Sequence, residues 1–125
     1  MVKELGEGGL MITIKCDLTN DEEVDTMFSQ IMKTWGGIDV CINNAAQIGS
    51  PKIMDGDRKE WRNLIDLNVI AYCYCAKKTV ESLKERDCDE GHIINICRTD
   101  HWSSSQRNSG YIAVLKVICM RFSDS

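Results

Sequence analysis

Short apolar runs alternate along the chain with longer amphipathic segments. The runs at residues 11–16 (M-I-T-I-K-C), 38–42 and 92–96 are short and rich in isoleucine, which predicts three strands. The 38–42 run is apolar on both faces, which is typical of a parallel strand that is covered on each side. Each run is followed by a segment with a different periodicity, so strands and helices should alternate.

The segment after the first run has the pattern of an amphipathic helix. Thr19 and Glu22 stand at capping-box spacing, and acidic residues crowd the turn that follows. The apolar residues of the segment recur every three or four positions: Val24, Met27, Phe28, Ile31, Met32 and Trp35. Such a stripe packs one side of a helix against a core. The glycine pair at 36–37 should end the helix.

Two further helices are expected. One begins near Asp55 or Asp57 and runs to about Arg86, giving the range 57–86. The other covers 111–120, although its β-branched residues have low helix propensity. The order strand–helix–strand–helix–strand–helix is the signature of an α/β fold.

The 38–42 run ends abruptly in two amides and two small residues, Asn43, Asn44, Ala45 and Ala46. Parallel α/β sheets bind ligands beyond the carboxyl ends of their strands. Amides there can bond the sheet backbone or a ligand, and small residues allow a ligand to approach closely. From these residues alone, a plain turn and a ligand site remain equally open.

Size and charge exclude several function classes. The 125 residues predict one domain, 1–125, and the net charge of −4 comes without a basic cluster, so no nucleic-acid partner is expected. The longest nearly unbroken apolar run, 69–76, is far below the roughly 20 residues that cross a bilayer. The N-terminus has no apolar signal-peptide core. We therefore expect no membrane partner and a cytoplasmic location.

Seven cysteines are many for a chain of this length, and none forms a C-x-x-C pair. Three of them lie inside apolar runs, where a thiol behaves as a small hydrophobe. A zinc site can be drawn from His92, Cys97 and His101, but its spacing matches no standard zinc pattern. Reduced, buried thiols and no metal site are the expectation.

The order of several short motifs resembles the short-chain dehydrogenase/reductase family. Asp17 follows the first strand, N-N-A-A the second, Asn68 lies in the long helix, N-I-C follows the third strand, and Tyr111 then precedes a lysine. The stretch K-E-R-D-C-D-E-G-H-I-I-N-I is similar to the subgroup of small cytosolic carbonyl and hydroxysteroid reductases. The likeness spans about residues 4–118.

The resemblance implies an incomplete Rossmann-like, doubly wound parallel sheet of about three strands with flanking helices. It implies an NAD(P)(H)-dependent oxidoreductase that interconverts a carbonyl and an alcohol on a small molecule, with NADP favoured over NAD. Asp17, Leu18, Asn43, Asn44 and Ala45 match cofactor-binding positions. Ala46 replaces the glycine of the family's N-N-A-G turn, which costs little where φ is negative.

The resemblance also implies catalytic roles for Asn68, Tyr111 and Lys116. An ammonium must lower the phenol pKa, ordinarily about 10, for proton transfer near neutrality. The family places its lysine four residues after the tyrosine, whereas Lys116 follows by five, which rotates it about 140° from Tyr111 on a helix instead of about 40°. Arg98 stands where the family has a serine that bonds the substrate oxygen.

The family's glycine-rich phosphate turn, T-G-x-x-x-G-x-G, does not occur in these residues, and neither does its C-terminal substrate region. The resemblance makes G-E-G-G, at 6–9, the end of a helix. Two family strands that lie between 11–16 and 38–42 are missing, which leaves a gap of about 14 Å, or three strand spacings. Either the 11–16 strand shifts across to pair directly, or it keeps unpaired backbone groups. We expect marginal stability.

Three readings remain. The first is a chain descended from a reductase, whose 125 residues are inactive on their own. The second is a non-catalytic fragment or pseudoenzyme that associates, as a homo-oligomer, through the helices at 57–86 and 111–120 and uses the apolar band 69–76 as its interface. The third is a thiol or metal module built on the cysteines.

Overall fold

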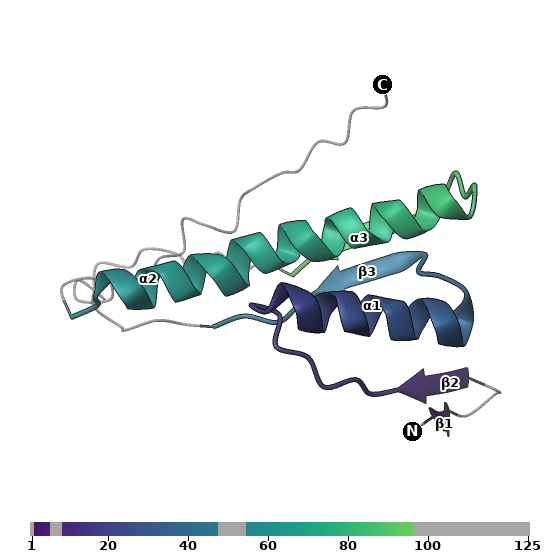
Figure 1. Cartoon of the computed structure of the whole chain (residues 1–125), viewed down its shortest axis with the longest axis horizontal. Coiled ribbons are helices and arrows are strands. Elements are labelled where there is room, and N and C mark those ends of the chain that lie inside the picture. Colours follow the sequence, from purple (N-terminus) through teal and green to yellow (C-terminus); the bar gives the residue numbers. More distant parts are fainter. Residues whose placement is uncertain (1, 6–8, 48–54, 97–125) are drawn as a thin grey trace, which may run out of the picture.

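The computed structural model describes residues 2–5, 9–47 and 55–96. A continuous long helix formed by three consecutive segments dominates it, and a second helix lies alongside (Figure 1). The elements in chain order are β1 (Val2–Leu5), β2 (Gly9–Ile12), α1 (Asp21–Trp35), β3 (Val40–Asn43), α2 (Arg58–Ile65), the π-helical segment η2 (Asp66–Ile70), α3 (Ala71–Glu85) and β4 (His92–Asn95).

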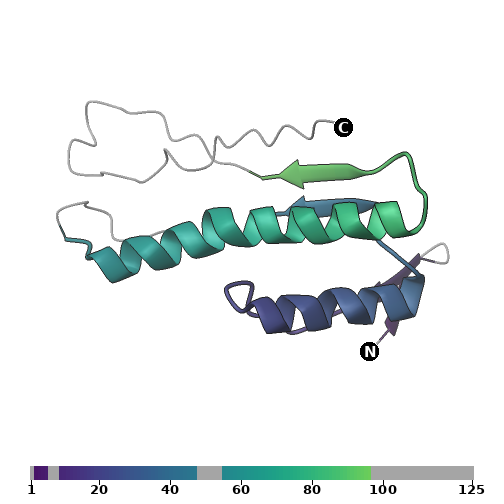
Figure 2. The ribbon, with the colours of Figure 1, turned by 45° about the horizontal axis from the view of Figure 1, so that its top comes forward.

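The predicted pairing of the second and third strands is confirmed. β3 and β4 are parallel, with Val40 opposite His92 and Asn43 opposite Asn95. Parallel neighbours need a long crossover, and the helix α2–η2–α3 supplies it. Figure 2 shows this helix lying along the two strands, with α1 beside it. The α/β alternation read from the sequence therefore holds for residues 21–95.

The two faces of the β3–β4 sheet differ. Cys41 and Asn43 point to the side that α3 covers, and Asn43 is buried. On the other side, Val40 is 48% exposed, Ile42 60% and Ile94 44%. The expectation that the strand is covered on both faces is therefore not met within the described residues, because nothing in them packs on that second face.

The N-terminal strand does not join the main sheet. β2 pairs with β1 in an antiparallel hairpin that forms a separate two-stranded sheet. Residues 13–16 are not in a strand, so the predicted strand at 11–16 keeps only its first two residues. The expected helix end before it is also wrong, because residues 2–5 are extended.

The hairpin matches neither of the two alternatives that the sequence left open for the 11–16 strand. The strand neither shifts across to β3 nor leaves both edges unpaired. Unpaired N–H and C=O groups are costly, and the nearest extended partner along the chain is residues 2–5. Pairing with a close neighbour in sequence costs less loop-closure entropy than pairing with β3, which comes only after α1.

Helix α1 begins one residue later than the capping-box reading implied. Its N-cap is Asn20, whose side-chain oxygen accepts from the N–H groups of Glu22 (3.0 Å) and Glu23 (3.3 Å). Thr19 instead donates to the carboxylate of Asp17, through both its N–H and its hydroxyl. The predicted stop is confirmed, since Gly36 caps the helix with a φ of 78°.

The core forms where α1 meets α3. Val24, Phe28 and Cys75 are buried together there. At the solvent edge of the same contact, Lys78 lies 2.7 Å from the Asp25 carboxylate, and Tyr74 donates to that carboxylate at 2.9 Å. Apolar packing inside, together with an ion pair and a hydrogen bond at the solvent edge, therefore holds the two helices together.

The apolar band at 69–76 largely faces inward. Its buried members are Val69, Ala71, Tyr72, Cys75 and Ala76. These residues support the chain's own core and cannot also form an association surface. No helix in the described part of the chain is long and apolar enough to cross a membrane.

Candidate functional site

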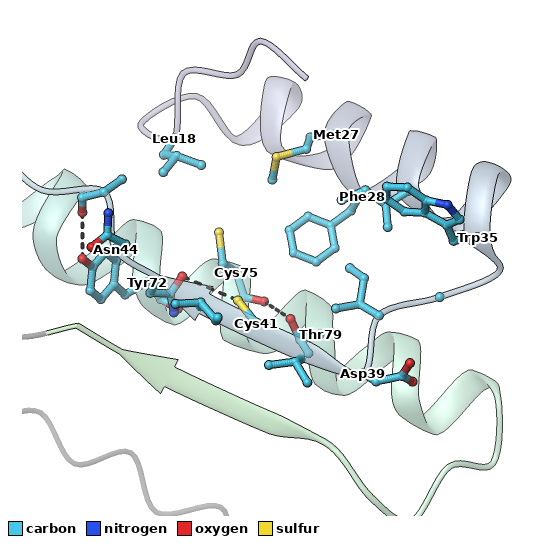
Figure 3. Close-up of a pocket in the computed structure, with 17 residues that line it drawn as sticks. Leu18, Met27, Phe28, Trp35, Asp39, Cys41, Asn44, Tyr72, Cys75 and Thr79 are labelled. Carbon is cyan, nitrogen blue, oxygen red and sulfur yellow. Dashed lines mark hydrogen bonds between the residues drawn. The ribbon is translucent and has the colours of Figure 1, made fainter. Parts of the chain in front are cut away.

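The turn that follows β3 is held by two side chains of the long helix. The Asn68 amide bonds both backbone groups of Gln47: its nitrogen donates to the carbonyl at 2.9 Å, and its oxygen accepts from the N–H at 3.0 Å. The Tyr72 hydroxyl donates to the Ala45 carbonyl at 2.7 Å, as Figure 3 shows. Because the two residues are four apart, they share one helix face, and they fasten the turn at two points.

Asn68 lies in the middle of the π-helical segment η2. Such segments widen a helix by one residue and occur frequently at functional sites. The long helix is therefore irregular at this asparagine. Its side-chain amide is engaged by the turn, so in this structure Asn68 acts as a positioning residue.

The two asparagines of the N-N-A-A turn have different environments. Asn43 is buried, and its side-chain nitrogen donates to the Asn95 side-chain oxygen at 2.9 Å and to the Tyr72 carbonyl at 3.5 Å. It thus ties β3 to both β4 and α3. Asn44 and Ala45 are exposed. In the structure Asn43 stabilises the sheet, whereas Asn44 and Ala45 are exposed to solvent.

Asp17 and Leu18 lie in the loop before α1. The Asp17 pKa is lowered because its carboxylate accepts from the backbone N–H and the hydroxyl of Thr19. Asp17 therefore stays ionised and can accept a hydrogen bond. Leu18 lines the same cavity as Asn44 and Ala45, and Figure 3 shows Leu18 and Asn44 toward one end of it. Asn43 lines this cavity as well, so the structure brings together four of the five predicted cofactor-binding residues.

This cavity is an apolar groove of about 490 Å³ between α1 and β3. Met27 and Phe28 point into it from α1, and the Cys75 side chain points into it from α3 (Figure 3). The amides of the β3 turn stand at one end and Asp39 at the other. An apolar groove with polar groups at its ends has the general character of a ligand site.

Three cysteines surround the core contact beside this groove. Burial raises the pKa of the Cys16, Cys41 and Cys75 thiols, and that of Cys75 rises to about 11. A thiol acts as a nucleophile or metal ligand only as the thiolate. No cluster of His, Cys, Asp or Glu that could hold a metal is present among the described residues. We therefore interpret these three thiols as packing groups.

The thiol pKa values predict selective alkylation. At about pH 8 only about one Cys75 thiol in a thousand is ionised, whereas Cys88 is exposed. We expect iodoacetamide to modify Cys88 at least about tenfold faster than Cys75, as measured by timed alkylation and peptide mass spectrometry. Concentrated urea, as the control, should remove the difference. Equal rates in the native chain would show that Cys75 is accessible and ionised.

Several predicted site residues lie outside the described part of the chain. These include the catalytic candidates Tyr111 and Lys116, together with Arg98. Two of the three residues of the drawn zinc site, Cys97 and His101, do so as well, and the third, His92, is an exposed residue of β4. The predicted roles of the residues that lie outside the described part of the chain stay predictions.

Two important residues were not selected from the sequence. Tyr72 was read only as part of an apolar band, although its position one turn after Asn68 could have suggested a contact with the same turn. Asn95 bonds Asn43 because the two are register partners across β3 and β4. Only the pairing of the strands reveals that contact.

The chain matches known proteins over most of its length. The family model described as short chain dehydrogenase matches residues 1–114. The dehydrogenase/reductase SDR family member 11 of Gallus gallus is 46% identical over 91 residues, which are 73% of this chain and 36% of that protein. An uncharacterized oxidoreductase of Staphylococcus aureus is 34% identical over 100 residues, covering 80% of this chain and 42% of its own length. The chain thus spans well under half of these relatives.

Solved structures give the same result. A short-chain type dehydrogenase/reductase from Mycobacterium marinum superposes with a TM-score of 0.66 at 25% identity, covering 76% of this chain and 40% of that one. The aldohexose dehydrogenase of Thermoplasma acidophilum superposes with a TM-score of 0.60 at 33% identity, covering 67% and 32%. These likenesses confirm that the fold is a fragment of the Rossmann-like α/β architecture. Together with the N-N-A-A turn and the helix asparagine that holds it, they show that the chain belongs to the short-chain dehydrogenase/reductase family.

Proposed function

We propose that the chain forms part of an NAD(P)(H)-dependent oxidoreductase that interconverts a carbonyl and an alcohol on a small-molecule substrate. The observation that carries this proposal is the doubly fastened turn after β3: Asn68 and Tyr72 hold it while Asn44 and Ala45 stay exposed. Family membership supplies the reaction class.

The described residues fit the adenosine side of such a cofactor. Asn44 and the small Ala45 leave room for close approach, Leu18 offers an apolar contact in the same cavity, and the Asp17 carboxylate can accept from an amino group. When bound, the cofactor would supply the hydride. NADP is favoured over NAD, and we place the activity in the cytoplasm. The whole of 1–125 is assigned to one partial cofactor-binding domain.

The fit does not extend to the phosphates. Backbone N–H groups of a glycine-rich turn and a helix N-terminus normally hold the pyrophosphate of a dinucleotide. The sequence contains no T-G-x-x-x-G-x-G segment. We therefore propose that these 125 residues alone neither hold the cofactor nor catalyse the reaction.

Calorimetry tests this proposal. Titration of NADPH into the 125-residue chain should give no measurable isotherm at micromolar concentrations, because the phosphate-binding turn is missing. The matched control is the Gallus gallus relative under the same conditions, which should bind. A chimaera should also bind when it joins this chain to the part of that relative that precedes the matched region. The Asn44→Gly substitution should weaken NADPH binding by this chimaera. A clear micromolar isotherm from the chain alone would contradict the proposal.

The second candidate function, association as a non-catalytic fragment, is favoured by one observation. Ile65 is 38% exposed and Ile70 is 51% exposed on the long helix. These isoleucines, and not the buried residues of the band at 69–76, are the apolar surface that this helix offers a second copy. Sedimentation of the chain over a range of concentrations separates this candidate from a monomer.

A further inference from the structure

Asp55 and Gly56 form an exposed turn just before the long helix. Asp55 is exposed, and neither residue belongs to a helix or a strand. Asp57 follows and caps α2, because its carboxylate accepts from the N–H of Glu60 at 2.8 Å. Within the described part of the chain, neither the Asp55 carboxylate nor the Gly56 N–H has a hydrogen-bond or ion-pair partner. Both groups are therefore free to react with each other.

An aspartate that precedes a glycine can react with the backbone beside it. The Gly56 nitrogen attacks Cγ of Asp55, the new N–Cγ bond closes a five-membered succinimide ring, and the nitrogen's proton leaves with a carboxyl oxygen as water. A second water then opens the ring. Opening at Cγ restores aspartate, whereas opening at the main-chain carbonyl carbon leaves the chain running through Cγ, as isoaspartate. The rearrangement changes neither mass nor net charge and needs no oxidant, reductant or co-substrate.

No other aspartate of the sequence is followed by a glycine. Glycine has no Cβ to shield its nitrogen, and its backbone adopts the conformations that ring closure needs at little cost. Asp39 provides the contrast within the described residues. Its side chain is 71% exposed, but its carboxylate bonds Arg86 at 2.8 Å. Val40, which follows it, is a β-branched strand residue.

We propose that Asp55 is a modification site, at which the folded chain converts spontaneously to isoaspartate. The modified residue offers a free α-carboxylate where the chain had a peptide carbonyl. An S-adenosylmethionine-dependent methyltransferase that is specific for isoaspartyl carboxylates would recognise that group. The site does not depend on the proposed oxidoreductase activity.

The turn fits closely against the start of α2, so the modification should alter that contact. A Cβ built on Gly56 would collide with the Trp61 indole, which shows that the ring lies against the glycine. Isoaspartate adds one methylene to the main chain directly before this glycine and therefore displaces it from the ring. Leu64 is the first buried residue of α2, so the core should stay intact.

Ageing of the full 125-residue chain tests the site. The folded chain is kept at neutral pH for several weeks, digested, and labelled with a purified isoaspartyl methyltransferase and radioactive S-adenosylmethionine. Fragmentation by electron transfer then locates the labelled peptide. Isoaspartate should accumulate at Asp55 at least about tenfold faster than at any other aspartate, because only there is the next residue a glycine.

The chain contains its own control and allows a conservative variant. Glu90 is exposed, lies outside any helix or strand and precedes Gly91, but its longer side chain would have to close a six-membered ring. No label is expected at Glu90. For the same reason Asp55→Glu should abolish the label at that position, and the cap at Asp57 is left in place. In NMR spectra of the aged chain, the indole N–H signal of Trp61 should split, whereas signals of the fully buried Val24 should not.

Four results would overturn the proposal. Label spread evenly over the aspartates would mean that the turn has no special reactivity. Label that persists in Asp55→Glu would place the isoaspartate elsewhere. A rate in the folded chain more than about tenfold below that in concentrated urea would show that the native turn holds the nitrogen away from the carboxylate. A labelled chain whose Trp61 signal is unchanged would contradict the predicted loss of the contact with Gly56.

Discussion

Phe28→Ala is expected to lower the free energy of unfolding by about 3–5 kcal/mol. Phe28 is 7% exposed and packs with Val24 and Cys75 in the cluster that joins α1 to α3. Removing the ring takes away much of the apolar contact in a small core and leaves a cavity that opens toward the groove. Because we expect this chain to be only marginally stable, below the about 5–15 kcal/mol that is common for small domains, this single change should leave it largely unfolded.

The measurement is urea denaturation followed by circular dichroism. Trp35→Ala is the matched control, because it removes another aromatic side chain from the same helix, but one that is 46% exposed. It should cost no more than about 1–2 kcal/mol. An equal decrease in the free energy of unfolding for the two variants would mean that the contact between α1 and α3 is not the main source of stability.

Asn43→Ala should cost about 2–3 kcal/mol of stability, although it changes a polar residue. The buried Asn43 side chain donates to the Asn95 oxygen and to the Tyr72 carbonyl. Its removal leaves both acceptors without that donor and opens a space between β3, β4 and α3. Losing a buried hydrogen-bond partner costs about 1–3 kcal/mol for each group left unsatisfied.

The neighbouring asparagine provides the control in the same denaturation experiment. Asn44 is exposed, so Asn44→Ala should change the free energy of unfolding by no more than about 0.5 kcal/mol. If the two alanine variants were equally stable, the division of the N-N pair into a buried structural residue and a solvent-exposed residue would be wrong.

Local patterns predicted the helices well. The apolar stripe from Val24 to Trp35, the stop at Gly36 and a helix start near Asp57 all correspond to observed elements. These features depend on residues within a few positions of each other, so the sequence contains all that is needed to recognise them. The N-cap was misplaced by one residue because Asn20 and Thr19 are both good caps, and the Asp17 carboxylate engages Thr19.

The site was predicted in part. The resemblance selected Asn43, Asn44, Ala45 and Asn68, and the structure places all four at the carboxyl end of β3 or against the turn that follows it. It did not select Tyr72, because a tyrosine within an apolar helical band is indistinguishable from a core residue until the chain opposite its hydroxyl is known.

By itself the sequence predicted the helices that are observed at 21–35 and 58–85 and the stop at Gly36, because periodicity and capping act over short distances. The family resemblance added the parallel arrangement of the runs at 38–42 and 92–96. Only the tertiary structure decided that β2 pairs with the preceding strand β1, and that one asparagine of the pair is buried while the other faces solvent. It also decided that no other described residue covers one face of the β3–β4 sheet. Those outcomes depend on which backbone groups find partners far apart in the chain. The choice among possible backbone partners depends on the free energy of the whole fold, so a local sequence pattern does not predict it.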